Sequence, residues 1–141
     1  MENEIKKIWF FKQSPQEVWD YITKPELIEQ WLMKNNFKPT IGHKFQFTFA
    51  AKEGSKYAGV VNCEVLDIKP FSKLSYTWDG STTDGRVFNS EVEWTLQPKN
   101  NGTELQLSHE GFTVLEDILN HSGGWDSCLK KMEDLLNQSK K

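Results

Sequence analysis

The sequence predicts an α+β fold in which an antiparallel sheet is wrapped around one long C-terminal helix. Between residues 45 and 109, apolar side chains alternate with polar ones in five successive runs, which is the period of strands with one face toward solvent. Turn-forming residues separate the runs, and the intervals are too short for the crossover helices that parallel neighbours would need. After residue 124 the apolar spacing changes to that of a helix.

The N-terminal part predicts one strand followed by two short helices. Residues 5–11 are rich in aromatic and β-branched side chains and are expected to form a strand. Ser14, Pro15 and Glu17 then match a capping box, with a hydroxyl acceptor at the cap and proline at the first helical position. Pro25 ends this helix and opens the next, because proline is tolerated only in the first turn of a helix.

Five further strands are expected from the alternating runs. Their inward-facing members are Phe45, Phe47 and Phe49; Val61, Cys63 and Val65; Leu74, Tyr76 and Trp78; Val92, Trp94 and Leu96; and Leu105, Leu107 and His109. The turn signals between them are Glu53-Gly54, Lys69-Pro70, Asp79-Gly80 with Asp84-Gly85, and Asn101-Gly102. Evenly spaced hairpins of this kind form an antiparallel sheet.

The C-terminal helix is predicted from Trp125, Leu129, Met132 and Leu136, which recur at steps of four, three and four and therefore share one face. The pair Gly123-Gly124 comes directly before them, where glycine would let the backbone turn sharply into the helix. The helix is therefore expected to begin at about Trp125 and to lay this face across the sheet.

The composition indicates one domain over residues 1–141 and argues against a nucleic-acid partner. A chain of this length buries a full core without disulfides or metals. Its formal net charge is −3, from 17 basic and 20 acidic residues. Arg86 is the only arginine, whereas nucleic-acid binders carry clustered basic side chains. Cys63 and Cys128 are far apart and are expected to be free thiols.

The N-terminus does not have the pattern of a signal peptide. No apolar run approaches the roughly 20 residues that span a bilayer, so membrane insertion is not expected. These features predict a reduced, cytoplasmic protein. The frequent Lys and Asn residues are typical of an AT-rich bacterial genome.

Short motifs along almost the whole chain match a known superfamily in order and spacing. They are Ser14-Pro15 with Val18-Trp19, Pro25-Glu26-Leu27 with Trp31, Leu74-Ser75-Tyr76-Thr77-Trp78, Gly102-Thr103-Glu104-Leu105, His109-Glu110-Gly111-Phe112, and Gly124-Trp125. Through them the chain resembles the START-like (SRPBCC) superfamily, and within it proteins similar to the C-terminal domain of the activator of the heat-shock-protein-90 ATPase. The resemblance implies a helix-grip fold, in which a curved sheet of six or seven strands grips the last helix and leaves a cavity between them.

The resemblance does not imply one activity, because the superfamily includes lipid carriers, hormone binders, polyketide cyclases and co-chaperone domains. The first hypothesis is non-enzymatic binding of a hydrophobic small molecule or lipid in the cavity. The second is a protein interaction module like the chaperone ATPase activator, and the third is a small cyclase- or hydrolase-like enzyme. The chain lacks the additional N-terminal domain of the eukaryotic activators, which argues against a chaperone partner.

Inward-facing residues of the sheet and the last helix are expected to line the cavity. The expected ligand-binding residues are Phe47, Val61, Cys63, Tyr76, Trp78, Val92, Trp94, Leu107, His109, Trp125 and Leu129. The alternative is that these side chains meet in a filled core, since burial alone produces the same periodicity. An empty cavity of about 300 Å³ would cost roughly 7 kcal/mol, so a pocket here must be small, hydrated or occupied.

No catalytic residue, metal site or cofactor is expected. His43, His109 and His121 are far apart, with no metal-ligand spacing among them or with the cysteines. Only His109 is expected to point inward, and strand alternation places its neighbour Glu110 on the opposite face, where it cannot assist acid–base catalysis. His43 and His121 are expected to be solvated, and Arg86 to be exposed in a loop.

Overall fold

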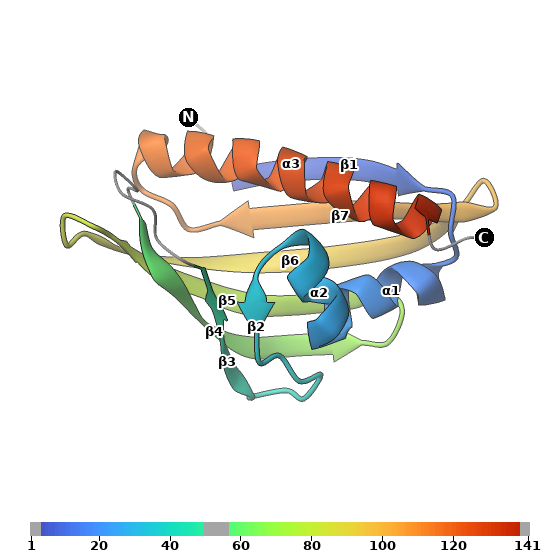
Figure 1. Ribbon diagram of the computed structural model, residues 1–141, viewed down its shortest axis with the longest axis horizontal. Coiled ribbons are helices and arrows are strands. Elements are labelled where there is room, and N and C mark those ends of the chain that lie inside the picture. The colour runs from blue at the N-terminus through green and yellow to red at the C-terminus, as the bar shows by residue number, and fades with distance from the viewer. Residues whose placement is uncertain (1–3, 50–56, 139–141) are drawn as a thin grey trace.

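The fold is a curved antiparallel sheet that holds one long helix against its inner face (Figure 1). The computed structural model describes residues 4–49 and 57–138. In chain order the elements are β1 (Glu4–Phe11), α1 (Pro15–Thr23), α2 (Pro25–Trp31), β2 (Lys34–Asn35), β3 (Lys44–Thr48), β4 (Tyr57–Lys69), β5 (Lys73–Thr82), β6 (Val87–Lys99), β7 (Gly102–Glu110) and α3 (Leu115–Gln138). The predicted α+β class is confirmed, with two short helices after the first strand and a long helix at the end.

The sheet has seven strands in the order β1-β7-β6-β5-β4-β3-β2, and each neighbouring pair is antiparallel. Consecutive strands from β2 to β7 are neighbours, whereas β1 joins the far edge beside β7. The two-residue strand β2 is too short to show a periodicity in the sequence. The predicted turn at Glu53-Gly54 lies outside the described residues.

Gly80 lies inside a strand and not in the turn that the pair Asp79-Gly80 predicts. β5 continues through both residues, and the chain turns at Asp84-Gly85, where Gly85 has a φ of 93°. Gly80 is opposite Phe88 across β5 and β6, and a Cβ atom on Gly80 would stand 2.6 Å from Phe88 Cζ. Glycine at this position therefore leaves room for the Phe88 ring to lie over the strand.

α3 begins at Leu115 and not near Trp125, so the predicted helix start is wrong. Gly123 and Gly124 lie within the helix, where each glycine costs about 1 kcal/mol relative to alanine. Upstream of them the helix is anchored by Asp117, whose buried side chain accepts hydrogen bonds from Tyr57 at the start of β4 and from Arg86 in the β5–β6 turn. None of the helices in residues 4–49 and 57–138 is both long enough and apolar enough to cross a membrane.

Buried apolar side chains form one cluster between the sheet and the helices. On the C-terminal half of α3, Leu129, Met132 and Leu136 are each no more than 1% exposed. On the sheet, the fully buried Trp94 meets the Trp125 ring edge-on at a centroid distance of 5.5 Å. The predicted helix face therefore lies against the sheet along this half of α3.

Candidate functional site

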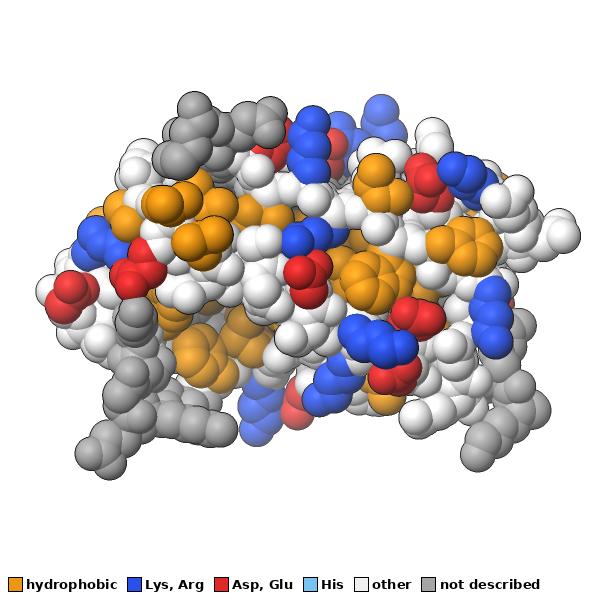
Figure 2. Space-filling model, turned by 90° about the horizontal axis from the view of Figure 1, so that it is seen from above, with side chains coloured by type: hydrophobic (Ala, Val, Ile, Leu, Met, Phe, Trp, Pro, Cys, Tyr) orange, Lys and Arg blue, Asp and Glu red, His pale blue; other side chains and the backbone are white. Residues whose placement is uncertain are grey.

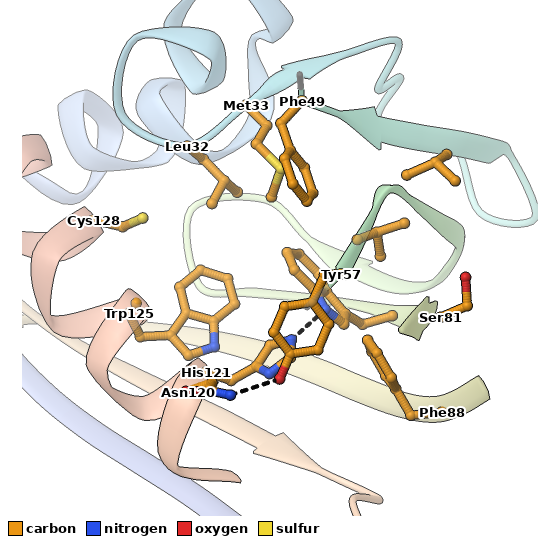
Figure 3. A pocket seen from close by; sticks show the side chains of 14 residues that line it. Leu32, Met33, Phe49, Tyr57, Ser81, Phe88, Asn120, His121, Trp125 and Cys128 are labelled. Atoms are coloured by element: carbon orange, nitrogen blue, oxygen red, sulfur yellow. Dashed lines mark hydrogen bonds between the residues drawn. The ribbon is translucent and has the colours of Figure 1, made fainter. Parts of the chain in front are cut away.

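A cavity of about 190 Å³ lies under the N-terminal half of α3 (Figure 3). Its walls come from α3, β4, β5 and β6, from the segment that follows α2, and from the end of β3. The lining residues are Leu32, Met33, Phe49, Tyr57, Val60, Val61, Trp78, Ser81, Phe88, Asn120, His121, Gly124, Trp125 and Cys128. Among the residues that the structure describes, 4–49 and 57–138, no Lys, Arg, Asp or Glu lines the cavity, so this part of the wall suits uncharged groups.

Aromatic rings form much of the wall. Trp78 and Trp125 lie at a centroid distance of 5.3 Å, and Phe88 and His121 at 5.4 Å. The Tyr57 ring contacts two of these, at 5.4 Å from His121 and 6.0 Å from Phe88. Tilted and edge-to-face pairs at such distances stabilise one another. The rings therefore hold the wall in place without a ligand.

His121 is a fixed and neutral part of this wall, and its prediction as a solvated residue is wrong. Trp78 Nε1 donates to His121 Nε2 across 3.3 Å, and His121 Nδ1 lies 2.9 Å from the backbone oxygen of Asp117. An indole nitrogen only donates and a carbonyl oxygen only accepts, so Nδ1 carries the ring hydrogen. Burial lowers the pKa of His121 and favours the same neutral form.

His109 and Ser90 are in contact, but their hydrogen bonds run in the wrong direction for nucleophilic catalysis. Trp125 Nε1 donates to His109 Nδ1 across 2.9 Å, so His109 Nε2 carries the hydrogen and donates to Ser90 Oγ at 2.8 Å. Ser90 Oγ donates in turn to the Trp78 backbone oxygen at 2.6 Å. A serine nucleophile needs an imidazole that accepts its proton, and here that lone pair is in use. Burial also lowers the pKa of His109 well below its usual value.

One polar cluster lies at the edge of the cavity, between the β5–β6 turn and the start of α3. Arg86 donates from both terminal nitrogens to the Asp117 carboxylate, with Nη2 and Oδ1 3.2 Å apart. The Tyr57 hydroxyl donates to Asp117 Oδ1 at 3.0 Å, and Asn120 Nδ2 donates to the Tyr57 hydroxyl at 3.1 Å. The four side chains form one chain of hydrogen bonds that ends at the cavity.

The Asp117 carboxyl of this cluster remains ionised although it is buried. Burial of the carboxyl would raise the pKa of Asp117, but hydrogen bonds from Arg86 and Tyr57 outweigh burial and lower it. Burial raises the pKa of Tyr57, which retains its proton. The Asp117 side chain is 1% exposed and that of Arg86 34%. Arg86 therefore lies in the loop between β5 and β6, as predicted, but its side chain is partly covered by the ion pair and not fully exposed.

Three of the eleven predicted site residues line the cavity: Val61, Trp78 and Trp125. The other eight are buried in the core but are not among the lining residues: Phe47, Cys63, Tyr76, Val92, Trp94, Leu107, His109 and Leu129. Two of them form a hydrogen bond with each other, in which Trp94 Nε1 donates to the Tyr76 hydroxyl at 2.9 Å. The structure therefore places the predicted residues in one region, with the cavity at its edge.

The lining residues that the sequence did not reveal come mostly from α3 and from connecting segments. Asn120, Gly124 and Cys128 lie at steps of four on one side of α3, which the predicted helix start concealed. Glu116 and Asp117 were the available signal, because acidic residues favour the first turn of a helix. A helix predicted to begin at these acidic residues would have placed Asn120, Gly124 and Cys128 on one side of it.

Within residues 4–49 and 57–138, no group of three or more His, Cys, Asp or Glu side chains is placed to hold a metal ion. Cys63 and Cys128 are free thiols, and burial raises the pKa of both, to about 11 for Cys128. Neutral thiols are poor nucleophiles, so neither is activated. Cys128 lines the cavity and its reaction with a reagent can report whether the cavity is occupied.

Comparison with known proteins finds relatives over nearly the whole chain. The family described as activator of Hsp90 ATPase homolog 1-like protein matches residues 12–137. The crystal structure of protein MLL2253 from Mesorhizobium loti is similar with a TM-score of 0.87 at 34% identity, over 98% of this chain and 99% of that one. The solution structure of protein BH1534 from Bacillus halodurans has a TM-score of 0.74 at 25% identity, over 94% and 96%. The AHSA1 protein from Silicibacter pomeroyi shares the fold, with a TM-score of 0.81 at 21% identity over 96% and 99%. A search of curated proteins gave no match.

The seven-stranded curved sheet, the gripped helix and the apolar cavity between them define a START-like module. Within that class the chain belongs to the family of activator of Hsp90 ATPase homolog 1-like proteins. The resemblance that the sequence motifs indicate is confirmed. Membership in the family does not by itself assign an activity to this chain.

Proposed function

We propose that this protein binds a small, uncharged and largely apolar molecule in the cavity beneath the N-terminal half of α3, without transforming it. The observation that carries the proposal is the cavity of about 190 Å³, lined by uncharged and mainly apolar side chains. Three of the lining residues, Phe49, Asn120 and Gly124, are exposed, so the cavity opens to solvent. A ligand that covers its apolar wall would remove that surface from water and stabilise the folded protein.

Gly124 supports the proposal because it keeps the space open. A Cβ atom on Gly124 would meet no atom within 4 Å, and this residue lines the cavity. Alanine here would stabilise the helix by about 1 kcal/mol. Gly123 has the same open surroundings but does not line the cavity, so what distinguishes Gly124 is its place in the cavity wall.

The histidines support binding without chemistry. Both ring nitrogens of His109 and of His121 take part in hydrogen bonds within the protein. Neither imidazole has a nitrogen free to exchange a proton with a molecule in the cavity. The binding hypothesis is therefore better supported than the cyclase- or hydrolase-like one.

Substitution of the two adjacent glycines tests the proposal. Gly124→Leu places a side chain at the cavity, whereas Gly123→Leu adds the same side chain to the same helix at a residue that does not line it. A library of uncharged one- and two-ring compounds is screened by thermal unfolding against the wild type and both variants. At about 100 times its Kd a ligand should stabilise the wild type and Gly123→Leu by roughly 2.7 kcal/mol, and Gly124→Leu much less.

Alkylation of Cys128 gives a second, independent readout of occupancy. A compound in the cavity should slow the reaction of Cys128 with a small maleimide, while Cys63, at 4% exposed, stays unreactive in all samples. Stabilisation by no compound, or equal stabilisation of Gly124→Leu, would reject the proposal.

Binding to a chaperone is the second candidate, favoured by the family and by an exposed apolar surface on α3. Leu115 and Leu119 are 51% and 62% exposed and lie four residues apart on one side of the helix. Figure 2, which looks down on the molecule from above Figure 1, shows hydrophobic side chains gathered near the end where α3 begins. Leu115→Lys with Leu119→Lys should abolish stimulation of a bacterial heat-shock-protein-90 ATPase, while Ile41→Lys, at a site 62% exposed elsewhere, should not. Unchanged turnover with the wild-type protein would eliminate this function.

A further inference from the structure

The polar atoms of the cavity wall are unequally available to a ligand. The indole nitrogens of Trp78 and Trp125 donate to His121 and His109, so both indoles offer only ring faces to the cavity. Both nitrogens of His121 are also in use. The rings are therefore an apolar surface, and a ligand held by them alone would be bound without a fixed orientation.

Asn120 differs from these residues because it is the last member of a series of hydrogen bonds in which each donor and each acceptor is fixed. Arg86 only donates and the Asp117 carboxylate only accepts, so the Tyr57 hydroxyl donates its hydrogen to Asp117. The Tyr57 oxygen then accepts from Asn120 Nδ2 at 3.1 Å. This bond uses one of the two amide hydrogens of Asn120 and leaves its carbonyl oxygen outside the chain.

The position of Asn120 suits a role in recognition. In Figure 3 its amide lies beside the Tyr57 hydroxyl at the α3 side of the cavity, while Ser81 lies well apart from both. Arg86 and Asp117, the charged members of the hydrogen-bonded chain, are paired with each other. Among the described lining residues a charged ligand group would lose its hydration without gaining a charged partner, whereas a neutral hydrogen-bonding group would gain a partner in Asn120.

We propose that Asn120 determines specificity by holding a hydroxyl group on an uncharged, single-ring ligand of this cavity. The inference rests on the proposed binding function and adds the chemical class of the ligand. An amide carbonyl and an N–H can both bond one hydroxyl, which is at once donor and acceptor. An engineered cavity of about 150 Å³ holds benzene, so the space of about 190 Å³ admits one ring with small substituents. Tyr57 acts as the positioning residue that orients the amide.

Two probes of nearly the same shape test the inference: 4-ethylphenol and 4-ethyltoluene, which differ by a hydroxyl in place of a methyl group. Their Kd values are measured by isothermal calorimetry for the wild type, Asn120→Leu, Tyr57→Phe and the control Ser127→Leu, an exposed α3 position outside the lining. The wild type and Ser127→Leu should bind 4-ethylphenol about 3- to 10-fold more tightly, as one added hydrogen bond provides. Tyr57→Phe should reduce this preference.

The preference in Asn120→Leu decides the matter. Asn120 is exposed at the edge of the cavity, so the substitution should abolish the preference for the phenol: the hydroxyl loses its amide partner but still meets water. Thermal unfolding of each variant confirms that it is folded. If the wild type binds 4-ethyltoluene as tightly as 4-ethylphenol, or Asn120→Leu keeps the preference for the phenol, the role of Asn120 is refuted while the binding function stands. If no uncharged probe binds at all, the proposed function fails and this inference fails with it.

Discussion

The two halves of α3 meet the same sheet in different ways. The C-terminal half presents Leu129, Met132 and Leu136 to a filled core, and each is at most 1% exposed. The N-terminal half borders a cavity and is anchored by hydrogen bonds of Asp117 and His121. Apolar contact stabilises one half and directional polar bonds fix the other. The difference separates a part of the helix that packs into the core from a part that borders the cavity of the proposed binding function.

Truncation of a side chain that faces the filled core and of one that faces the cavity should show the largest effect. Leu129→Ala removes a fully buried side chain and should lower the free energy of unfolding by about 2–5 kcal/mol. Cys128→Ala, one residue away but at the cavity, should cost less than about 1 kcal/mol because the space beside it is already open. Urea unfolding with equal m-values measures both. Equal losses would mean that the helix is sealed along its whole length.

The C-terminal half of α3, which packs against the filled core, is the part that the sequence could predict. The steps of four, three and four from Trp125 to Leu136 follow from burial alone, and so do the alternating strands. The N-terminal half of α3, called here the open half, has no such pattern, because a cavity wall needs no continuous apolar stripe. Its cavity is completed by three strands and by the segments after α2 and β3, whose approach depends on tertiary packing, and its anchors, Asp117 and His121, are polar.

Acidification should lower the free energy of unfolding through two histidines, His121 in the open half of α3 and His109 on β7. His109 and His121 are held neutral, with a lowered pKa in the folded chain, so the unfolded chain binds more protons once the pH falls below about 6.5. Stability present at neutral pH is therefore lost as the pH drops. For His109 the slope approaches about 1.4 kcal/mol per pH unit at the acidic end, which amounts to about 1.6 kcal/mol between pH 6.5 and 5.

Urea unfolding at a series of pH values from 7 to 5 measures this slope. His109→Gln should flatten the curve, because glutamine does not titrate but can still accept from the Trp125 indole. A wild-type free energy of unfolding that is constant over this range would contradict the neutral assignment of both rings.

Two tyrosines offer a matched pair across the boundary. Tyr76→Phe in the filled core leaves the buried Trp94 N–H without an acceptor and should cost about 1–2 kcal/mol. Tyr57→Phe at the cavity removes one donor to Asp117, but Arg86 still binds the carboxylate and water can enter, so the loss should be about 0.5–1 kcal/mol. Thermal unfolding measures both, and a larger loss for Tyr57→Phe would place the more rigid polar network at the cavity.

The smallest expected effect is also the most specific for the open half. Gly123→Ala and Gly124→Ala should each stabilise the ligand-free protein by about 0.5–1 kcal/mol, because alanine favours the helix and a Cβ at either position meets no atom within 4 Å. With 4-ethylphenol present the two should separate, because only the Gly124→Ala methyl group enters the cavity. Thermal unfolding with and without the probe should then give full stabilisation of Gly123→Ala and a reduced stabilisation of Gly124→Ala. If the probe stabilises both equally, it binds elsewhere, and the open half of α3 is a defect in packing and not a binding site.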